Sequence, residues 1–111
     1  MLPKQYSFQL RKQRSFFQKA RRLFSPYFTL FSIPHSELKA VVVIPKKIVK
    51  LASGRNAAKR RVHKAFTEMI MESPSISSGF LLCFMAKSAA IAADHENLKA
   101  ELKKMLRQLS E

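Results

Sequence analysis

Residues 46–64, KKIVKLASGRNAAKRRVHK, form the segment from which both the fold and the partner of this chain are best predicted. The segment has Lys or Arg at positions 46, 47, 50, 55, 59, 60, 61 and 64, and it has no Asp or Glu. A solvated helix face usually alternates acids with bases, because like charges at neighbouring helical positions repel each other. Arg and Lys side chains bind phosphate oxygens. The segment therefore predicts a polyanionic partner, and a nucleic acid above all.

A helix is expected over residues 53–72, with Ser53 as its N-cap. Its apolar residues fall on one stripe, which is expected to pack on a core: Ala58, Val62, Ala65, Phe66, Met69 and Ile70. The opposite side is polar and basic, with Lys59 at its boundary: Asn56, Arg60, His63, Lys64 and Thr67. One helix is thus predicted to join a hydrophobic core to a basic surface.

The composition limits the class of protein. With 111 residues and 47% hydrophobic side chains, residues 1–111 are expected to fold as a single domain with a modest core. A net charge of +14 destabilises a compact chain unless a partner neutralises it. The apolar runs are much shorter than the roughly 20 residues of a membrane-spanning helix, and no secretory signal is visible. We therefore expect a cytoplasmic protein with no membrane partner, in which the single cysteine, Cys83, packs as a small hydrophobic side chain.

Further elements are expected on both sides of the basic segment. A helix is predicted over residues 12–24, where Phe and Leu recur at helical spacing before Pro26. Strands are predicted over 27–33, 39–44 and 79–86, with a turn-rich loop over 72–79. A last amphipathic helix over 95–109 follows Asp94, its expected cap. The order, α-β-β(-β)-α-β-α, favours an α+β fold: a two-layer α/β sandwich with helices packed on a small mixed sheet.

The aromatic strand over residues 27–33 suggests a second binding surface. Its side chains alternate, so Tyr27, Thr29 and Phe31 are expected on one face of the sheet and Phe28 on the other. Most of these aromatics are expected to be core. If the first face is only partly covered, Phe31 can stack single-stranded bases beside Lys and Arg.

Chemistry carried by the chain itself is not expected. The three histidines, His35, His63 and His95, lack the spacing of a metal site. Cys83 has no neighbouring His in a nucleophile pattern, and no pair of carboxylates stands in a context that suggests acid–base work. His63 is expected to contact solvent or phosphate.

The spacing Val49-x-x-Ala52-x-x-Arg55-Asn56-x-x-Lys59-Arg60 resembles the signature of the bacterial ribonuclease P protein subunit. The resemblance covers most of the chain. SFFQKARR is similar to the first helix of that family, FTLF to its first core strand, VVVIPKK to the strand that ends in paired lysines, and FLLCFMAK to the later strand. The family often has Arg where this chain has Ala57, and nearly always a basic residue where it has His63.

The resemblance implies a function. Such a protein binds a large catalytic RNA and the single-stranded 5′ leader of precursor tRNA, and the leader is removed to give the mature 5′ end. The chain would be an accessory subunit of this endoribonuclease, because the hydrolysis is carried out by the RNA with Mg²⁺ that the RNA mainly holds. The resemblance identifies no metal ligand in the protein and favours a monomer within the holoenzyme. It also implies the fold of the second domain of ribosomal protein S5, with an unusual left-handed β-α-β crossover.

The resemblance also assigns residues by position. The residues expected to bind the RNA subunit are Arg55, Asn56, Lys59, Arg60, Arg61, His63 and Lys64. The residues expected to bind the leader are Phe17, Arg21, Phe31, Lys46, Lys47 and Lys87. They would line a cleft between the first helix and the sheet.

Two other classes of protein fit parts of the pattern. A ribosomal or other structural RNA-binding protein of related α/β fold would share the charge and the architecture, and only the Arg-Asn…Lys-Arg spacing and the two surfaces separate it from the first hypothesis. A double-stranded DNA reader would use residues 53–72 as its recognition helix. The strands expected on both sides of that helix argue against a helix-turn-helix unit.

Overall fold

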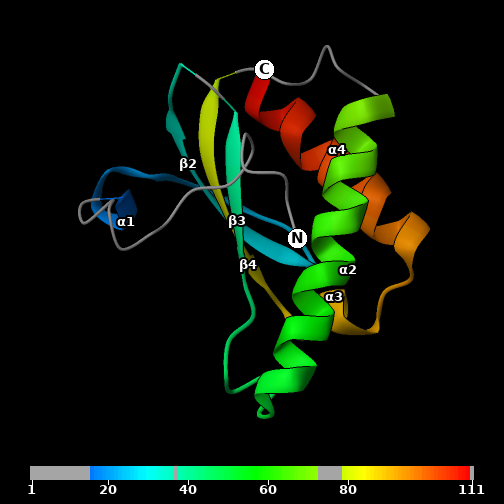
Figure 1. Cartoon of the computed structure of the whole chain (residues 1–111). Coiled ribbons are helices and arrows are strands. Elements are labelled where there is room, and N and C mark those ends of the chain that lie inside the picture. The colour runs from blue at the N-terminus through cyan, green and yellow to red at the C-terminus, as the bar shows by residue number, and fades with distance from the viewer. Residues whose placement is uncertain (1–15, 37, 73–78, 111) are drawn as a thin grey trace.

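A computed structural model describes residues 16–36, 38–72 and 79–110 of the chain. It shows a four-stranded sheet with its larger helices on one side (Figure 1). The elements in chain order are α1 (Phe16–Lys19), β1 (Arg21–Phe24), β2 (Phe28–Pro34), β3 (Lys39–Val43), α2 (Ala52–Glu72), β4 (Phe80–Ala86), α3 (Ser88–Ala92) and α4 (His95–Ser110). The predicted α+β fold with a small mixed sheet is confirmed.

The sheet has the strand order β1-β2-β4-β3. Strand β2 is antiparallel to both β1 and β4, whereas β3 and β4 are parallel. Since parallel neighbours need a crossover, the chain leaves β3, passes through α2 and returns in β4. The predicted β-α-β unit around the basic helix is therefore present, and its left-handed sense stays a prediction.

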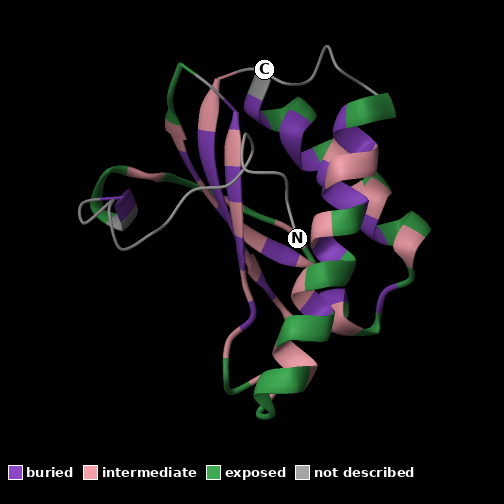
Figure 2. Ribbon diagram, in the orientation of Figure 1, coloured by how far each residue is buried: buried purple, intermediate pink, exposed green. Residues whose placement is uncertain are grey.

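The main core lies between the sheet and the layer of α2 and α4, whose buried residues are purple in Figure 2. Phe84 of β4 is at its centre, with ring centroids 5.7 Å from those of both Phe28 and Phe66 in edge-on arrangements. The predicted apolar stripe of α2 is buried as expected. Helix α4 contributes Leu98, Leu102, Met105, Leu106 and Leu109. The layer thus holds α2 firmly, with its polar side outward.

Within residues 16–36, 38–72 and 79–110, fewer side chains cover the opposite face of the sheet. Phe16 of α1 packs there with Leu81 and Cys83, and all three are buried. The partly buried side chains around them are Ala20, Phe31, Ile33, Val41 and Val43. We call this side the open face of the sheet. Cys83 packs as a small hydrophobic side chain, as predicted.

The prediction of one helix over residues 12–24 is wrong for residues 21–24. Helix α1 ends at Lys19, and Arg21–Phe24 form the edge strand β1. Residues 21–24 pair with β2, and this pairing overrides the helical pattern. The turn between the two strands is stabilised by the Ser25 hydroxyl, which accepts hydrogen bonds from the amides of Tyr27 (3.2 Å) and Phe28 (3.0 Å). Residues 12–15 lie outside the described part of the chain.

Two helix starts also bear on the sequence predictions. Ser53 is not the N-cap of α2, because the helix begins at Ala52 and the carbonyl of Leu51 already accepts a hydrogen bond from the Arg55 amide, at 3.0 Å. Asp94 does cap α4, since its Oδ1 accepts a hydrogen bond from the Asn97 amide at 2.8 Å. The short helix α3 was not predicted. Most of the loop expected over 72–79 falls on residues 73–78, outside the described ranges.

Candidate nucleic-acid interface

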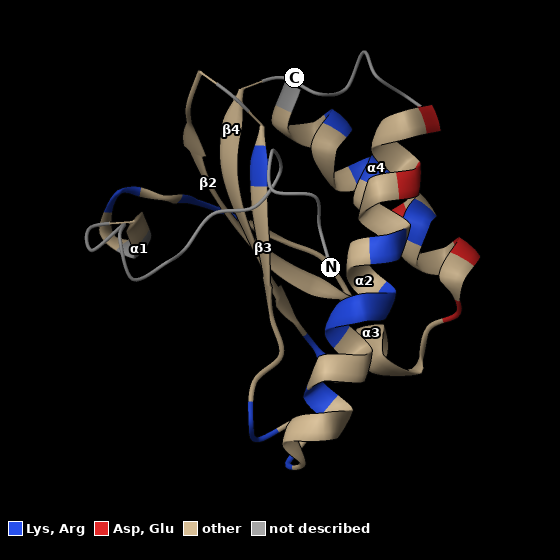
Figure 3. Ribbon diagram, in the orientation of Figure 1, with Lys and Arg blue, Asp and Glu red and all other residues tan. Residues whose placement is uncertain are grey.

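The outward side of α2 is basic along most of its length. Asn56, Arg60 and Lys64 are at least partly exposed there, and Lys59 is half-buried. In Figure 3 the Lys and Arg residues follow α2, whereas the acidic residues gather at the C-terminal end of α2 and the beginning of α4. We call Asn56, Lys59, Arg60 and Lys64 the α2 basic face.

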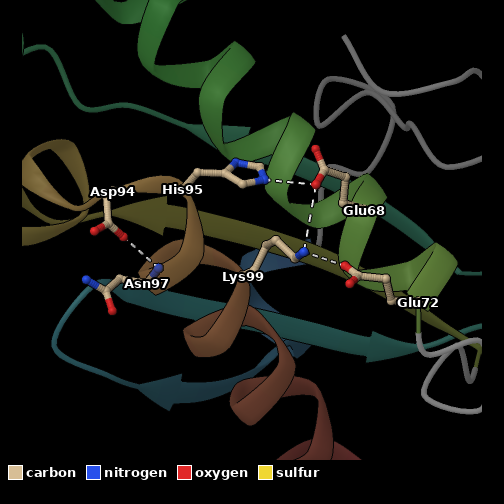
Figure 4. A network of polar contacts seen from close by, with 6 residues as sticks. All are labelled: Glu68, Glu72, Asp94, His95, Asn97 and Lys99. Atoms are coloured by element: carbon tan, nitrogen blue, oxygen red, sulfur yellow. Dashed lines mark hydrogen bonds and ion pairs between the residues drawn. The ribbon is translucent and has the colours of Figure 1, made fainter.

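The carboxylates of α2 are paired mainly with α4, although the charge of Lys64 also acts on Glu68. Glu68 and Glu72 of α2 both pair with Lys99 of α4, and the Glu68 Oε1 lies 3.0 Å from the His95 Nε2 (Figure 4). The hydrogen bond with His95 is the main reason why the pKa of Glu68 is lowered, and the hydrogen bond with Glu72 raises the pKa of Lys99. Among the described residues, no ion pair involves the α2 basic face. The acids serve to join α2 to α4.

Arg55 is held by the chain's own backbone. Its Nη1 donates hydrogen bonds to the carbonyls of Val49 (3.0 Å) and Lys50 (2.7 Å), in the connection between β3 and α2. The guanidinium therefore fixes this connection. Because an Arg side chain has five donors, Arg55 keeps others for an external ligand, but its position is set by the loop.

Arg61 is turned toward the α3–α4 junction. Its Nη1 donates to the carbonyl of Ile91 at 2.9 Å, and its Nη2 donates to the carbonyl of Ala93. These bonds tie the middle of α2 to the end of α3. The structure thus places Arg61 apart from the α2 basic face, as a residue that positions helices.

His63 does not present its ring nitrogens to solvent, so its expected contact with solvent or phosphate is not what the structure shows. Both nitrogens are buried and have no hydrogen-bond partner among the described residues. Desolvation is the main cause that lowers its pKa from 6.5 to about 4, and the positive charge of Lys59 adds to it. His63 is therefore a neutral side chain at the flank of α2.

The open face of the sheet carries the second set of candidates. Phe31 is half-buried there, and the guanidinium carbon of Arg22 lies 5.8 Å from the centre of its ring. The register pairs Arg22 with Phe31 and Arg21 with Ser32. Because paired residues share a face, Arg21 lies on the helix-covered side. Arg21 therefore does not share a face with Phe31, and Arg22 is the arginine beside Phe31. Leader binding by Arg21 stays a prediction.

The lysines of this set gather at one end of the sheet. Lys46 and Lys47 follow β3, and Lys87 follows β4. Because these two strands are parallel, their C-terminal ends lie at the same end of the sheet. The Lys87 Nζ donates a hydrogen bond to the Ser25 carbonyl at 2.7 Å and lies 5.8 Å from the centre of the Phe24 ring. The structure thus brings all three lysines to the same end of the sheet, and Lys87 to the open face beside Phe24.

Of the remaining predicted residues, Phe17 belongs to α1, but its side chain is outside the described ones. Sequence reasoning missed Arg22 and Phe24 on the open face. The stretch RRLF does not alternate between polar and apolar residues, so its two faces could be told apart only if residues 21–24 were recognised as a strand. With that strand assigned, positions 22 and 24 fall on the side of Phe31.

Comparison with known proteins relates this geometry to a family. The Ribonuclease P family model matches residues 2–110. The chain belongs to this family. It is 33% identical over 85 residues to the ribonuclease P protein component of a Nitratiruptor species, covering 77% of this chain and 73% of that protein. It is 32% identical over 96 residues to that of Photobacterium profundum, covering 85% of this chain and 78% of that protein.

Solved structures of this family share the fold. The ribonuclease P protein from Thermotoga maritima superposes with a TM-score of 0.75 at 18% identity, over 92% of this chain and 96% of that chain. The ribonuclease P protein from Staphylococcus aureus superposes with a TM-score of 0.70 at 15% identity, over 94% of each chain. The architecture inferred from the sequence is thus that of ribonuclease P proteins.

The described part of the chain offers no cluster of side chains that could bind a metal ion. Within residues 16–36, 38–72 and 79–110, no group of three or more His, Cys, Asp or Glu side chains is placed to hold a metal ion. None of the helices described is both long and apolar enough to cross a bilayer.

Proposed function

We propose that this chain is the protein subunit of a bacterial ribonuclease P, acting in the cytoplasm. The α2 basic face binds the catalytic RNA subunit, and the open face of the sheet binds the 5′ leader of precursor tRNA. The RNA, with Mg²⁺, removes the leader. The protein acts as a monomer that improves substrate affinity and supplies no catalytic group.

One observation supports this proposal above the others: two cationic surfaces of different chemistry lie on opposite sides of a two-layer domain. The α2 basic face is a rigid array of phosphate-directed donors with no aromatic residue. The open face joins half-buried aromatic and aliphatic side chains to Arg22, Lys46 and Lys87, as in sites that stack single-stranded bases. A helical face suits folded RNA, and an aromatic sheet face suits an unpaired leader.

The roles of the polar residues of α2 differ from those that the sequence alone suggested. The direct contacts are assigned to Asn56, Lys59, Arg60 and Lys64. Arg55 and Arg61 keep α2 in place through the backbone carbonyls of its neighbours. His63 makes no RNA contact, because its ring nitrogens are buried.

The experiment is reconstitution with a bacterial ribonuclease P RNA at low Mg²⁺, scoring release of the leader from precursor tRNA. We expect activity only when the protein is added. Arg60→Ala should weaken assembly with the RNA subunit, with the fold intact. Lys104→Ala is the matched control, since Lys104 is exposed on α4 and its loss removes the same charge. Unchanged RNA cleavage with and without the protein would contradict the proposal.

The alternative function, a structural RNA-binding protein of related fold, predicts no dependence on the leader. Phe31→Ala separates the two, because only precursor tRNA has a leader to stack. In the reconstituted complex this variant should weaken binding of precursor tRNA roughly 5- to 100-fold and leave binding of mature tRNA unchanged. An equal loss for both tRNAs would assign Phe31 to the core.

A further inference from the structure

Phe24 is the most unusual side chain on the open face. It lies in the edge strand β1 and its side chain is 67% exposed, although most Phe residues of the described chain are buried or half-buried. A single exposed apolar side chain needs no explanation by itself. Phe24, however, has a cation above its ring, since the Lys87 Nζ lies 5.8 Å from the ring centre.

Phe24 also begins a row of side chains that crosses the whole sheet. The register pairs Phe24 with Thr29, Thr29 with Met85, and Met85 with Val43. Directly paired residues point to the same side, so all four lie on the open face. Thr29, Met85 and Val43 are half-buried. With strands about 4.8 Å apart, the row is about 14 Å long.

Positive charge borders this row on the side where β3 and β4 end. Lys46 and Lys47 are exposed beyond Val43, and Lys87 stands between Phe24 and the end of β4. One donor of the Lys87 ammonium group is used by the Ser25 carbonyl. An ammonium group has three donors, so Lys87 stays able to bind a phosphate while its position is fixed.

Resting on the proposed function, we propose that Phe24 is a base-stacking residue for the RNA leader, which crosses the sheet along the Val43–Met85–Thr29–Phe24 row. The bases lie over the apolar row, and one of them stacks on the Phe24 ring. The phosphates lie along Lys46, Lys47 and Lys87. The leader site therefore extends from the centre of the sheet, where Phe31 lies, to its outer edge.

A second copy of this chain is the other occupant to be weighed, because β1 is an edge strand with an exposed aromatic residue. Edge-to-edge pairing of two β1 strands would bring Arg21 and Arg22 of each copy close to those of the other. Both arginines are exposed, and no acidic residue occurs in β1 to balance them. The charge of this edge thus favours a polyanion.

The test uses the holoenzyme reconstituted with a bacterial ribonuclease P RNA, and it measures equilibrium binding of precursor tRNA and mature tRNA. Phe24→Ala is expected to weaken binding of the precursor roughly 5- to 100-fold and to leave the mature tRNA unaffected. Phe24→Trp should retain the affinity because it keeps a stacking surface. Met71→Ala removes an equally exposed apolar side chain outside the row and should change neither affinity.

Leader oligonucleotides with one abasic position give the second arm of the test. In the wild-type complex, one such position should weaken binding, and in the Phe24→Ala complex the same position should cause no further loss. The inference is overturned if Phe24→Ala binds precursor tRNA like the wild type, or if both tRNAs lose affinity equally. It is also overturned if sedimentation shows that the wild-type protein is a dimer and that the only effect of Phe24→Ala is to make it a monomer. If the wild-type complex itself does not prefer precursor to mature tRNA, the proposed function fails, and this inference fails with it.

Discussion

His63 shows how a single residue can depart from the role its position suggests. On a helical projection it belongs to the polar side of α2, but its two ring nitrogens are buried without a partner among the described residues. Burial disfavours the charged form of the ring and so lowers the pKa of His63 in the folded protein. His63 therefore makes the stability of this protein sensitive to acid.

The pH dependence follows from the direction of the pKa shift. The folded-state pKa of His63 is about 4, below the ordinary 6.5, so between these values the unfolded chain binds a proton that the folded chain excludes. Stability should therefore fall as the pH decreases from 6.5 toward 4, and this residue should have no effect above pH 7. Because the side chain is only partly buried, we expect a loss of about 1–3 kcal/mol.

The measurement is urea unfolding at several pH values, with the His63→Leu variant beside the wild type. Leu cannot be protonated, so the variant should lose this part of the pH dependence and be at least as stable at pH 7. An NMR titration of the His63 ring gives the pKa directly. Titration near 6.5, or identical pH profiles for the two proteins, would contradict the expectation.

The basic side chains of α2 mark the limit of prediction at the residue scale. Arg55, Arg60 and Arg61 are alike in sequence, but only Arg60 belongs to the α2 basic face. The other two donate to carbonyls of the β3–α2 connection and of the α3–α4 junction. Those carbonyls come from distant or irregular segments, so no local pattern could separate the three arginines.

At the scale of elements, the long helices and the strands with continuous apolar runs could be predicted from the sequence, whereas the short elements β1 and α3 could not. The stripe of α2 and the apolar runs of β3 and β4 bury enough surface to define their own structure. Strand β1 has four residues, and its burial pattern shows mostly exposed side chains. It exists because β2 pairs with it, which is a tertiary cause that a helical spacing of Phe and Leu conceals.

The start of β4 gives a prediction of this scale. A Cβ added at Gly79 would lie 1.9 Å from the carbonyl oxygen of His35, and the Gly79 carbonyl accepts a hydrogen bond from the His35 amide at 2.9 Å. The clash is with backbone and cannot be relieved by turning a side chain. We expect Gly79→Ala to lower the free energy of unfolding by about 2–3 kcal/mol, measured by urea denaturation.

Gly54 is the matched control for that variant. A Cβ there would meet only the Val49 Cγ1, at 2.9 Å, which is the end of a side chain. In addition, Ala is favoured over Gly by about 1 kcal/mol inside a helix. Gly54→Ala should therefore be close to neutral. If the two variants lower the free energy of unfolding by the same amount, the close approach of Gly79 to the His35 carbonyl is not what requires a glycine there.

At the scale of the whole molecule, the charge is divided by the fold and not only by the sequence. All described carboxylates lie at Glu68 and Glu72 of α2, at Asp94 or in α4, and those of α2 pair with α4. The two-layer architecture then leaves one basic surface on α2 and another around the open face. The resemblance to a family predicted both surfaces. Composition alone predicted only that a polyanion binds.

A generic attraction of a chain with net charge +14 and a specific contact through α2 differ in how they depend on salt. Each phosphate bound by a cation contributes a slope of about −0.7 to −0.9 to a plot of log affinity against log salt concentration. Lys59, Arg60 and Lys64 together should contribute roughly −2 to −3 to binding of the RNA subunit. Arg60→Ala should reduce the slope by about one contact. Lys104→Ala is the matched control, because Lys104 is exposed on α4 and its loss removes the same charge from the molecule. If both variants reduce the slope equally, net charge and not the α2 basic face governs assembly.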